Sequence, residues 1–461
     1  MWAVPWCFEP EDQIRFPPAV STGIRACGSF ELREVAGMDR VADDDVIIDR
    51  VAAIDVGKAE VVCCARTPAP LDRRGRRGRV QEVRKSSTMT RSLIELGDWL
   101  ASLGVTRVVM EATSDYWKPV FYVLEAAGFE TWLVNARDVK HLPGRPKTDT
   151  LDAVWLCKVA ERQMLRASFV APPPIRRLRD LTRYRVDLVA DRRRVKQRAE
   201  KLLEDAGIKL SVVASDIFGV SGRSMMQALV AGERDPGVLA QLALRSLRAK
   251  IPDLQEAFTG RFDDHHAFLL GGMLRQVDTL DADIAALEVR IEELVNPFAD
   301  QIQRLTAIPG IGVTAARAII AEIGVDMSRF PTAAHLASWA RFAPGVNSSA
   351  GKTKGSSATG HGNKYLAGVL GEAAISASRT KTFLGERYRR IARRRGKQRA
   401  LVAVGRSILI IIWHLLSESD AVFHDLGPDH YTNRIGSQRA IRNHIRGLNA
   451  LGYTVTLNPA A

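Results

Sequence analysis

The sequence has little cysteine, and the few cysteines lack a structural pattern. Cys7, Cys27, Cys63, Cys64 and Cys157 form an odd-numbered set without a C-x-x-C pair among 461 residues. Such a set disfavours both a disulfide framework and a structural zinc site. We therefore expect a reducing compartment.

The sequence also lacks a long uninterrupted apolar run. Its most apolar stretch, Ala400 to Leu416, contains Arg406 and His414. It falls short of the roughly 20 apolar residues that a membrane span needs. The N-terminus shows no basic segment followed by an apolar core, the pattern of a secretory signal. We expect a cytoplasmic protein without a membrane partner, in which Ala400 to Leu416 form a buried helix.

Acidic residues are scarce in the last quarter of the chain. Overall, 66 Lys and Arg oppose 52 Asp and Glu, for a net charge of +14. Between Arg341 and Ala461 the count is 19 Lys and Arg against 6 Asp and Glu. Nearly all the excess positive charge thus lies in one region, which predicts a polyanionic partner.

The hydrophobic pattern becomes regular at Ile48, after an N-terminal extension (residues 1–47) that shows neither helical nor strand periodicity and that we expect to be loose. The predicted strands cover residues 48–57, 59–67, 80–88, 105–112 and 130–135, and the predicted helices cover 91–103, 114–127 and a segment from about 149. Three consecutive strands followed by alternating helix and strand predict an α/β domain of the ribonuclease-H type over residues 48–171.

A helical coiled coil is predicted over residues 172–300. After the triplet Pro172 to Pro174, apolar residues recur every seven positions in an arginine-rich helix, and a second, acidic helix has apolar spacings of four and three. These apolar positions are Leu181, Leu188, Val195 and Leu202, then Met273, Val277, Leu280, Ile284, Leu287, Ile291 and Leu294. Opposite charge favours antiparallel pairing, within one chain or between subunits.

Residues 301–425 are predicted to form a mainly helical domain, followed by a basic tail over 426–461. Two helical segments flank the turn IPGIG, which contains Gly310 and Gly312. A helix-hairpin-helix of this kind presents backbone N–H groups to phosphate. The alternative is that both glycines only permit a tight corner between helices.

Four carboxylates are placed where sheet topology could bring them together. Asp55 ends the first predicted strand, Glu111 ends the fourth, and Asp149 and Asp152 share one face of the following helix. Converging carboxylates repel one another unless cations intervene, and hard oxygen ligands select Mg²⁺ or Mn²⁺. Asp149 and Asp152 could instead cap and begin a helix. A purely structural role is less convincing for Asp55 and Glu111, because they directly follow the apolar segments VAAI and VVM, where apolar strand residues are expected.

Two basic features could contact phosphate. Lys352 and Lys354 follow Ser348 and Ser349 in the loop PGVNSSAGKTKGSS, where a serine could act as a nucleophile if it were activated. The alternative is a flexible polar loop. The second feature is the run Arg387 to Arg399, which contains no acid. We expect four of its arginines to bind the nucleic-acid backbone: Arg389, Arg390, Arg393 and Arg394.

Taken together, these residues resemble the DEDD transposases of bacterial insertion sequences. The resemblance consists of Asp55, Glu111, the segment KTDTLDA with Asp149 and Asp152, the turn IPGIG, and a serine-bearing loop before a basic C-terminus. It covers roughly residues 48–417. The family has an N-terminal domain related to the RuvC Holliday-junction resolvase and includes the pilin-gene inversion recombinase.

The resemblance implies a metal-dependent DNA recombinase in which the four acids bind Mg²⁺ and a serine attacks the DNA strand. It also implies a structured noncoding guide RNA that pairs with donor and target DNA, and a homo-oligomer, dimer to tetramer, joined partly through the coiled coil. Alignment on Pro344 and Gly355 places the nucleophile at Ser349. Ser348 remains a competitor, because Asn347 and Ser348 depart from the family's pattern.

Two other functions remain open on the sequence. A RuvC-like, structure-specific endonuclease would use the same carboxylates with water as the nucleophile. A non-catalytic nucleic-acid-binding protein would need only the helix-hairpin-helix and the arginine run, but it gives no reason for Asp55 and Glu111 to end apolar strands.

Overall fold

The computed structural model describes residues 48–70, 78–135, 148–345, 347–349, 352–354, 359–360, 362–431 and 437–457. The predicted N-terminal extension, residues 1–47, therefore lies outside the described residues. Contacts divide the chain into two compact units between Val170 and Ala171. Each unit is described by itself.

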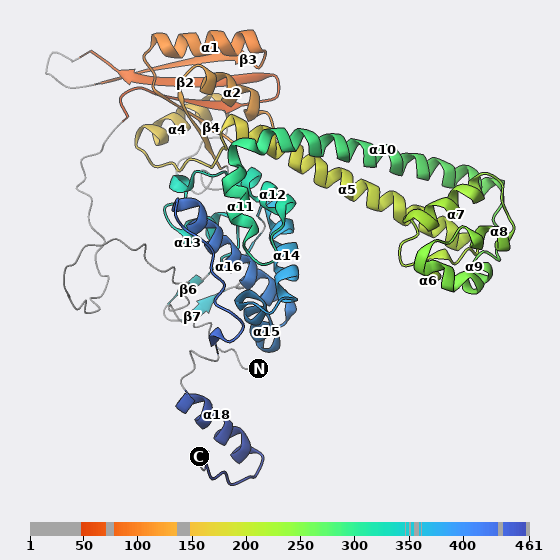
Figure 1. The fold of residues 1–461 in the computed structure, drawn as a ribbon. Coiled ribbons are helices and arrows are strands. Elements are labelled where there is room, and N and C mark those ends of the chain that lie inside the picture. Colours follow the sequence, from red (N-terminus) through yellow and green to blue (C-terminus); the bar gives the residue numbers. More distant parts are fainter. Residues whose placement is uncertain are drawn as a thin grey trace. The chain divides into compact units, whose positions relative to one another are not determined.

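The first unit is built on a five-stranded mixed sheet with the order β3-β2-β1-β4-β5 (Figure 1). Strands β1 (Val51–Val56), β2 (Glu60–Pro68) and β3 (Arg79–Ser87) form an antiparallel meander. Strand β4 (Arg107–Glu111) runs parallel to β1, and β5 (Glu130–Val134) runs parallel to β4. Each predicted strand is present within a few residues of its expected bounds.

Helices cover both faces of this sheet. Successive strand residues point to opposite faces, so each face carries its own set of apolar side chains that a helix can bury. On one face, Ile54 and Met110 pack with α1 (Thr90–Ser102) and α2 (Trp117–Ala126). On the other face, Ala53 and Val109 pack with α4 (Asp149–Glu161). This mixed α/β arrangement is consistent with a domain of the ribonuclease-H type.

The second unit begins with two long helices that pack against each other. Helix α5 (Pro173–Asp205) and helix α10 (Asp264–Val295) run antiparallel within one chain. Ion pairs fix the direction: Arg185 pairs with Glu288, and Arg192 pairs with Asp281. Of the predicted heptad positions, Val195 and Ile284 are among those buried, whereas others are half-buried.

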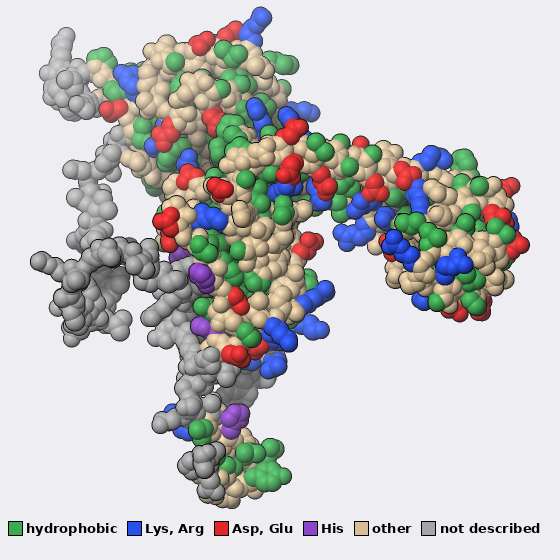
Figure 2. All heavy atoms as spheres, viewed as in Figure 1, with side chains coloured by type: hydrophobic (Ala, Val, Ile, Leu, Met, Phe, Trp, Pro, Cys, Tyr) green, Lys and Arg blue, Asp and Glu red, His purple; other side chains and the backbone are tan. Residues whose placement is uncertain are grey.

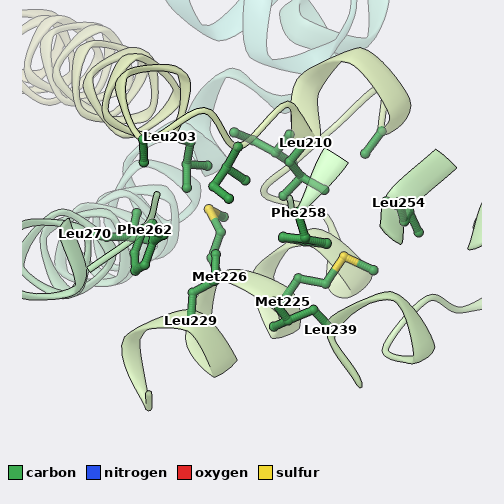
Figure 3. Packing of buried hydrophobic residues seen from close by; sticks show 14 of the residues in the cluster. Leu203, Leu210, Met225, Met226, Leu229, Leu239, Leu254, Phe258, Phe262 and Leu270 are labelled. Atoms are coloured by element: carbon green, nitrogen blue, oxygen red, sulfur yellow. The ribbon is translucent and has the colours of Figure 1, made fainter. Parts of the chain in front are cut away.

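A compact helical tip connects the two long helices (Figure 1), and the sequence analysis did not predict it. It contains α6 (Leu210–Val213), α7 (Val220–Val230), α8 (Pro236–Gln241), η1 (Arg245–Lys250) and α9 (Ile251–Ala257). Met225, Met226 and Phe258 point into a core that Leu203 of α5 and Leu270 of α10 complete (Figure 3). These helices are too short to show a clear period of 3.6 residues.

The remainder of the second unit is mainly helical, as expected. Its elements are η2 (Asn296–Phe298), α11 (Ala299–Thr306), α12 (Val313–Ile323), η3 (Met327–Arg329), α13 (Ala333–Trp339), α14 (Lys364–Ser378), α15 (Phe383–Arg395), α16 (Lys397–Ser417) and α18 (Ser437–Ala450). A two-stranded hairpin, β6 (Asn347–Ser349) and β7 (Lys352–Lys354), lies between α13 and α14 along the chain.

Helix α16 forms the core of this helical domain. Among the described residues it is the one helix long and apolar enough to cross a membrane by length and composition. Helices α13, α14 and α15 pack on it, and Val404, Ile408 and Ile412 are fully buried. The apolar run at Ala400 to Leu416 is therefore explained by packing inside the domain.

Candidate active site

Asp55 and Glu111 occupy neighbouring positions at one edge of the sheet. Ile54 of β1 pairs with Met110 of β4 in a parallel register. Asp55 and Glu111 come one residue later on their strands. Because adjacent strands lie about 4.8 Å apart, the two carboxylates start from neighbouring backbone positions. The topology brings together two acids that are 56 positions apart in the sequence.

Both acids lie on the sheet face that α4 covers. Ile54 and Met110 belong to the core on the α1 and α2 side, whereas Ala53 and Val109 belong to the core on the α4 side. Alternation along each strand therefore places Asp55 and Glu111 on the α4 side. Both side chains are half-buried at the rim of this apolar core.

Helix α4 runs antiparallel to β1, so its N-terminus lies toward Asp55. The Cys157 thiol donates to the Val51 carbonyl at 3.5 Å, and the Ile48 N–H donates to the Glu161 carbonyl at 3.0 Å. From position 157 back to 149 a helix rises about 12 Å, and from Val51 to Asp55 a strand advances about 13 Å. The first turn of α4 is thus roughly level with Asp55.

Positions 149 and 152 belong to the stripe of α4 that faces the sheet. Ala153, Leu156 and Cys157 are buried on that stripe, and helical spacings of three and four extend it to both aspartates. Thr148, not Asp149, is the N-cap, because its hydroxyl accepts from the Leu151 N–H. The capping explanation that the sequence allowed for Asp149 is therefore unnecessary. Asp152 is half-buried.

The donor chemistry of these residues suits a hard cation. Carboxylate oxygens are the preferred ligands of Mg²⁺ and Mn²⁺. Within the described residues no three His, Cys, Asp or Glu side chains stand close enough together to hold a metal ion, so Asp152 does not form such a group with Asp55 and Glu111. The side chain of Asp149 is outside the described ones. The structure thus places Asp55 and Glu111 side by side, with the first turn of α4 on their side of the sheet.

The opposite end of α4 is held by a buried carboxylate that sequence reasoning missed. Glu161 is 5% exposed and pairs with Arg66 of β2 at 2.8 Å and with Arg79 of β3. The signal in the sequence was an acid in the buried stripe of a helix. These ion pairs tie the C-terminal end of α4 to the sheet, so the direction in which its N-terminus points is fixed.

Three cysteines are buried in the described part of this unit. Cys63, Cys64 and Cys157 are buried and carry no disulfide. Burial raises the pKa of the Cys63 thiol. A hydrogen bond with Cys64, together with burial, raises the pKa of Cys157. Because the thiolate is the reactive form, the raised pKa values keep Cys63 and Cys157 neutral, and neither thiol serves as a nucleophile or a metal ligand.

The predicted serine loop contains a short hairpin. Ser349 pairs with Lys352 across it, and Ser348 pairs with Thr353. The side chains of these residues and of Lys354 lie outside the described ones. Just before the hairpin, Phe342 is buried, and a Cβ at Gly405 of α16 would lie 2.6 Å from its ring. The chain therefore enters the hairpin from a fixed point in the core.

The two glycines of the turn have different surroundings. Gly310 has a φ of +94°, and a Cβ there would lie 2.3 Å from the Ala373 carbonyl oxygen of α14. Close packing of the turn on α14 thus accounts for Gly310. Gly312 is the N-cap of α12, and a Cβ there would meet nothing within 4 Å. Of the two glycines, Gly312 has the room that a phosphate contact would need.

The arginine run begins on α15 and ends in the first turn of α16, and Lys and Arg side chains gather on the surface around α15 (Figure 2). Arg389 donates to Glu386 at 3.0 Å and to the carbonyls of Thr380 and Ser378 at 3.1 and 3.3 Å. The Arg390 guanidinium lies over the Tyr431 ring, 4.4 Å from its centroid. Arg393 and Arg394 are exposed in the last turn. The four predicted arginines thus divide into those with partners inside the domain and those open to solvent.

We expect the double variant Arg393→Gln/Arg394→Gln to weaken the salt dependence of DNA binding. The slope of log affinity against log salt should fall by about 0.7–0.9 for each phosphate contact removed. The control is Arg389→Gln, which removes an intramolecular hydrogen-bonding group and should lower thermal stability without changing the slope. Filter binding from low to high salt measures both. An unchanged slope in the double variant would make this end of α15 an ordinary solvated surface.

Comparison with known proteins gives concordant results for both units. Residues 52–208 match a family of DEDD transposases of the IS110 type, and residues 302–389 match the transposase family IS116/IS110/IS902. The first match contains Asp55, Glu111 and α4, and the second contains the IPGIG turn, the hairpin and most of α15.

Two relatives with transposase names and one insertion-element protein each align with most of the chain. A probable family 20 transposase of Pseudomonas aeruginosa is 27% identical over 329 residues, which span 70% of this chain and 87% of that protein. The transposase for insertion sequence element IS1111A of Coxiella burnetii is 25% identical over 70% of this chain and 80% of its own length. An insertion element IS110 protein of Streptomyces coelicolor is 26% identical over 61% of this chain and 73% of its own length. The chain therefore belongs to the IS110 family of DEDD transposases, and it is a DNA transposase.

Proposed function

We propose that this transposase cuts and rejoins DNA strands with a carboxylate site on the first unit and a serine nucleophile on the second. The observation that carries the proposal is the parallel register of β1 and β4, which sets Asp55 and Glu111 side by side on the face covered by α4. Asp149 and Asp152 complete the set from the first turn of that helix.

In this proposal the four acids hold Mg²⁺ or Mn²⁺. The bound cations would polarise the scissile phosphodiester and stabilise the charge that develops on its oxygens. Asp55 and Glu111 would hold them from the rigid sheet, and Asp149 and Asp152 from α4, whose far end is tied down by Glu161. The rigid support matters because a misplaced reacting group loses much of its rate.

The nucleophile in this proposal is the hydroxyl of Ser349. Its oxygen attacks the phosphorus, the bond from phosphorus to one DNA oxygen breaks, and the serine proton leaves to solvent or a nearby base. The departing DNA oxygen takes up a proton from solvent or from that base. The product is a serine–DNA phosphodiester plus a free DNA hydroxyl, and attack by another DNA hydroxyl on this phosphodiester completes strand exchange. The serine and the carboxylates must meet on the DNA, from one chain or from two copies of it.

We further propose that a structured noncoding RNA from the element guides the choice of donor and target DNA. The exposed Arg393 and Arg394, the open turn at Gly312 and the hairpin lysines Lys352 and Lys354 are candidate contacts for nucleic-acid phosphates. A homo-oligomer, dimer to tetramer, and a cytoplasmic location belong to the same proposal. Membership of the family supports both, and the clustered positive charge supports the nucleic-acid contacts.

Sequencing the nucleic acid that copurifies with the full chain tests the guide. The protein is expressed beside a plasmid that carries its encoding DNA segment with the natural flanks. We expect one discrete RNA transcribed from that segment, and we expect ribonuclease to stop the formation of new DNA junctions by the purified complex. Random cellular RNA, or junction formation that ribonuclease does not affect, would contradict the guided mechanism.

A further inference from the structure

Outside the carboxylate site, the helical domain contains an acid of unusual burial. Glu322 of α12 is 2% exposed within the apolar sequence IIAEIG. Its two oxygens accept from Arg183 of α5, at 2.7 Å each. Arg179, one turn earlier on α5, donates to the carbonyls of Ala321 and Glu322 at 2.9 Å. Burial of a carboxylate is costly unless it is paired and hydrogen-bonded in this way.

Asn363 joins Glu322 to the end of the serine segment. The Asn363 amide donates to a Glu322 oxygen, while its carbonyl oxygen accepts from the N–H groups of Tyr365 and Leu366. Asn363 is thereby both a partner of Glu322 and the N-cap of α14. It stands at the point where the chain returns from the hairpin that carries Ser349.

The two ends of this segment meet. A Cβ at Gly362 would lie 2.9 Å from the Ala340 carbonyl oxygen and 3.0 Å from the Arg341 side chain, so the returning chain packs on the chain that leads to the hairpin. Phe342, buried beside Gly405, fixes the outgoing end. The hairpin therefore projects from a closed base, and Asn363 and Glu322 anchor one side of that base.

Tyr365, two residues after Asn363, adds further contacts with the long helix α5. The Arg183 guanidinium lies over the Tyr365 ring, 4.8 Å from its centroid, and the Tyr365 hydroxyl donates to Asp187 at 3.1 Å. Arg179, Arg183 and Asp187 recur at intervals of four on one face of α5. This face therefore binds α12 and the first turn of α14 together. Both oxygens of Glu322 already accept hydrogen bonds from the Arg183 guanidinium or the Asn363 amide. They therefore serve this junction between helices rather than a metal ion.

We propose that Arg183, Glu322 and Asn363 form an anchor that positions the serine hairpin for strand transfer. The inference rests on the proposed role of Ser349. The three are positioning residues: they touch no reacting atom but fix the base of the hairpin to α5 and α12. A displacement of about 1 Å in a reacting group can lower a rate about 100-fold, so loosening the anchor slows the serine step.

Two substitutions at Asn363 separate positioning from folding. Asn363→Ser retains an oxygen that caps α14 but removes the amide that binds Glu322. Asn363→Asp also retains the cap but sets a carboxylate against Glu322. The double variant Asn363→Asp/Glu322→Gln re-forms a carboxylate–amide pair between the two positions with the net charge unchanged, but it weakens the pairing with Arg183, which donates to the same Glu322 oxygen as Asn363. Thr332→Asp is the matched control, since it adds a carboxylate at the exposed N-cap of α13.

The readout is the single-turnover rate of protein–DNA adduct formation, measured with DNA affinity and the thermal unfolding midpoint. We expect Asn363→Asp to lower the rate about 100-fold, the double variant to recover part of that loss, and Thr332→Asp to match wild type. Asn363→Ser should slow the step with unchanged affinity, and its midpoint, although lowered by the lost hydrogen bond to Glu322, should stay well above the assay temperature. If Asn363→Asp unfolds, Asn363→Ser and the double variant decide the question.

The outcomes distinguish the anchor from the proposed nucleophile. If the wild-type protein forms an adduct through Ser349 and the Asn363 variants form it at the same rate, the anchor has no positioning role. A fall in rate that merely follows the fraction of unfolded protein also overturns it. If wild type forms no adduct at Ser349, the proposed function fails first, and the anchor proposal falls with it.

Discussion

Replacing Ser349 by Ala is expected to abolish both strand joining and the denaturant-stable protein–DNA adduct. The hydroxyl is the proposed attacking group, and loss of a catalytic nucleophile typically costs a factor of a thousand or more. Ser348→Ala is the matched control one residue away and should retain both activities. Denaturing gels with end-labelled DNA measure the adduct, and amplification across the new junctions measures joining.

The pair of serine variants also tests the two alternatives. If the adduct persists in Ser349→Ala but vanishes in Ser348→Ala, the nucleophile is Ser348. If metal-dependent cleavage survives the loss of both serines, water is the nucleophile, and the chain cleaves DNA as a RuvC-like endonuclease would.

Asp55→Asn and Asp149→Asn are each expected to lower Mg²⁺-dependent strand joining by at least about 100-fold. Loss of groups that merely support metal ligands costs 10- to 100-fold, and these variants remove a charged ligand while keeping its shape. Without metal, the thermal unfolding midpoint should stay the same or rise, because repulsion among the carboxylates is relieved. The upward shift of the midpoint that Mg²⁺ produces in wild type should be lost.

Asp115→Asn is the control for this prediction. Asp115 follows β4 by a few residues, is exposed, and pairs with Lys118 at 2.8 Å. Its loss should leave activity and the Mg²⁺-induced stabilisation intact. Undiminished strand joining in Asp55→Asn or Asp149→Asn would discard the metal-site assignment.

The sheet and its acids could be predicted from sequence because each leaves a local signal. Strands β1 and β4 are short apolar runs that end in an acid, and an acid where apolar residues are expected marks Asp55 and Glu111. The topology, a meander followed by parallel strands, then brings the ends of β1 and β4 together. The alternative that Asp149 is the N-cap of α4 is wrong, because Thr148 occupies that position.

Other features could not be predicted because they depend on packing between distant segments. The tip helices are too short for a period to be read, and their core forms only when α5 and α10 close around them. The turn glycines look equivalent in sequence, but only Gly310 touches the backbone of α14. In the arginine run, the partners of Arg389 are backbone carbonyls that no pattern reveals.

The anchor residues could be predicted from the sequence only in part. Glu322 carries the same signal as Asp55, an acid inside an apolar run, and Asn363 before α14 is a typical N-cap. Neither signal predicts which residue the side chain binds. Arg183 is 139 residues before Glu322 in the sequence, and its role follows only from the packing of α5 on α12.

Mapping the DNA-linked peptide tests the central claim most directly. The wild-type complex is trapped on DNA that carries the natural ends of the element, denatured, digested with protease and nuclease, and analysed by mass spectrometry. We expect a nucleotide attached to Ser349 in a peptide from the β6–β7 hairpin, formed only with Mg²⁺ or Mn²⁺. A nucleotide on a residue outside this hairpin, or cleaved DNA without any linked peptide, would contradict it.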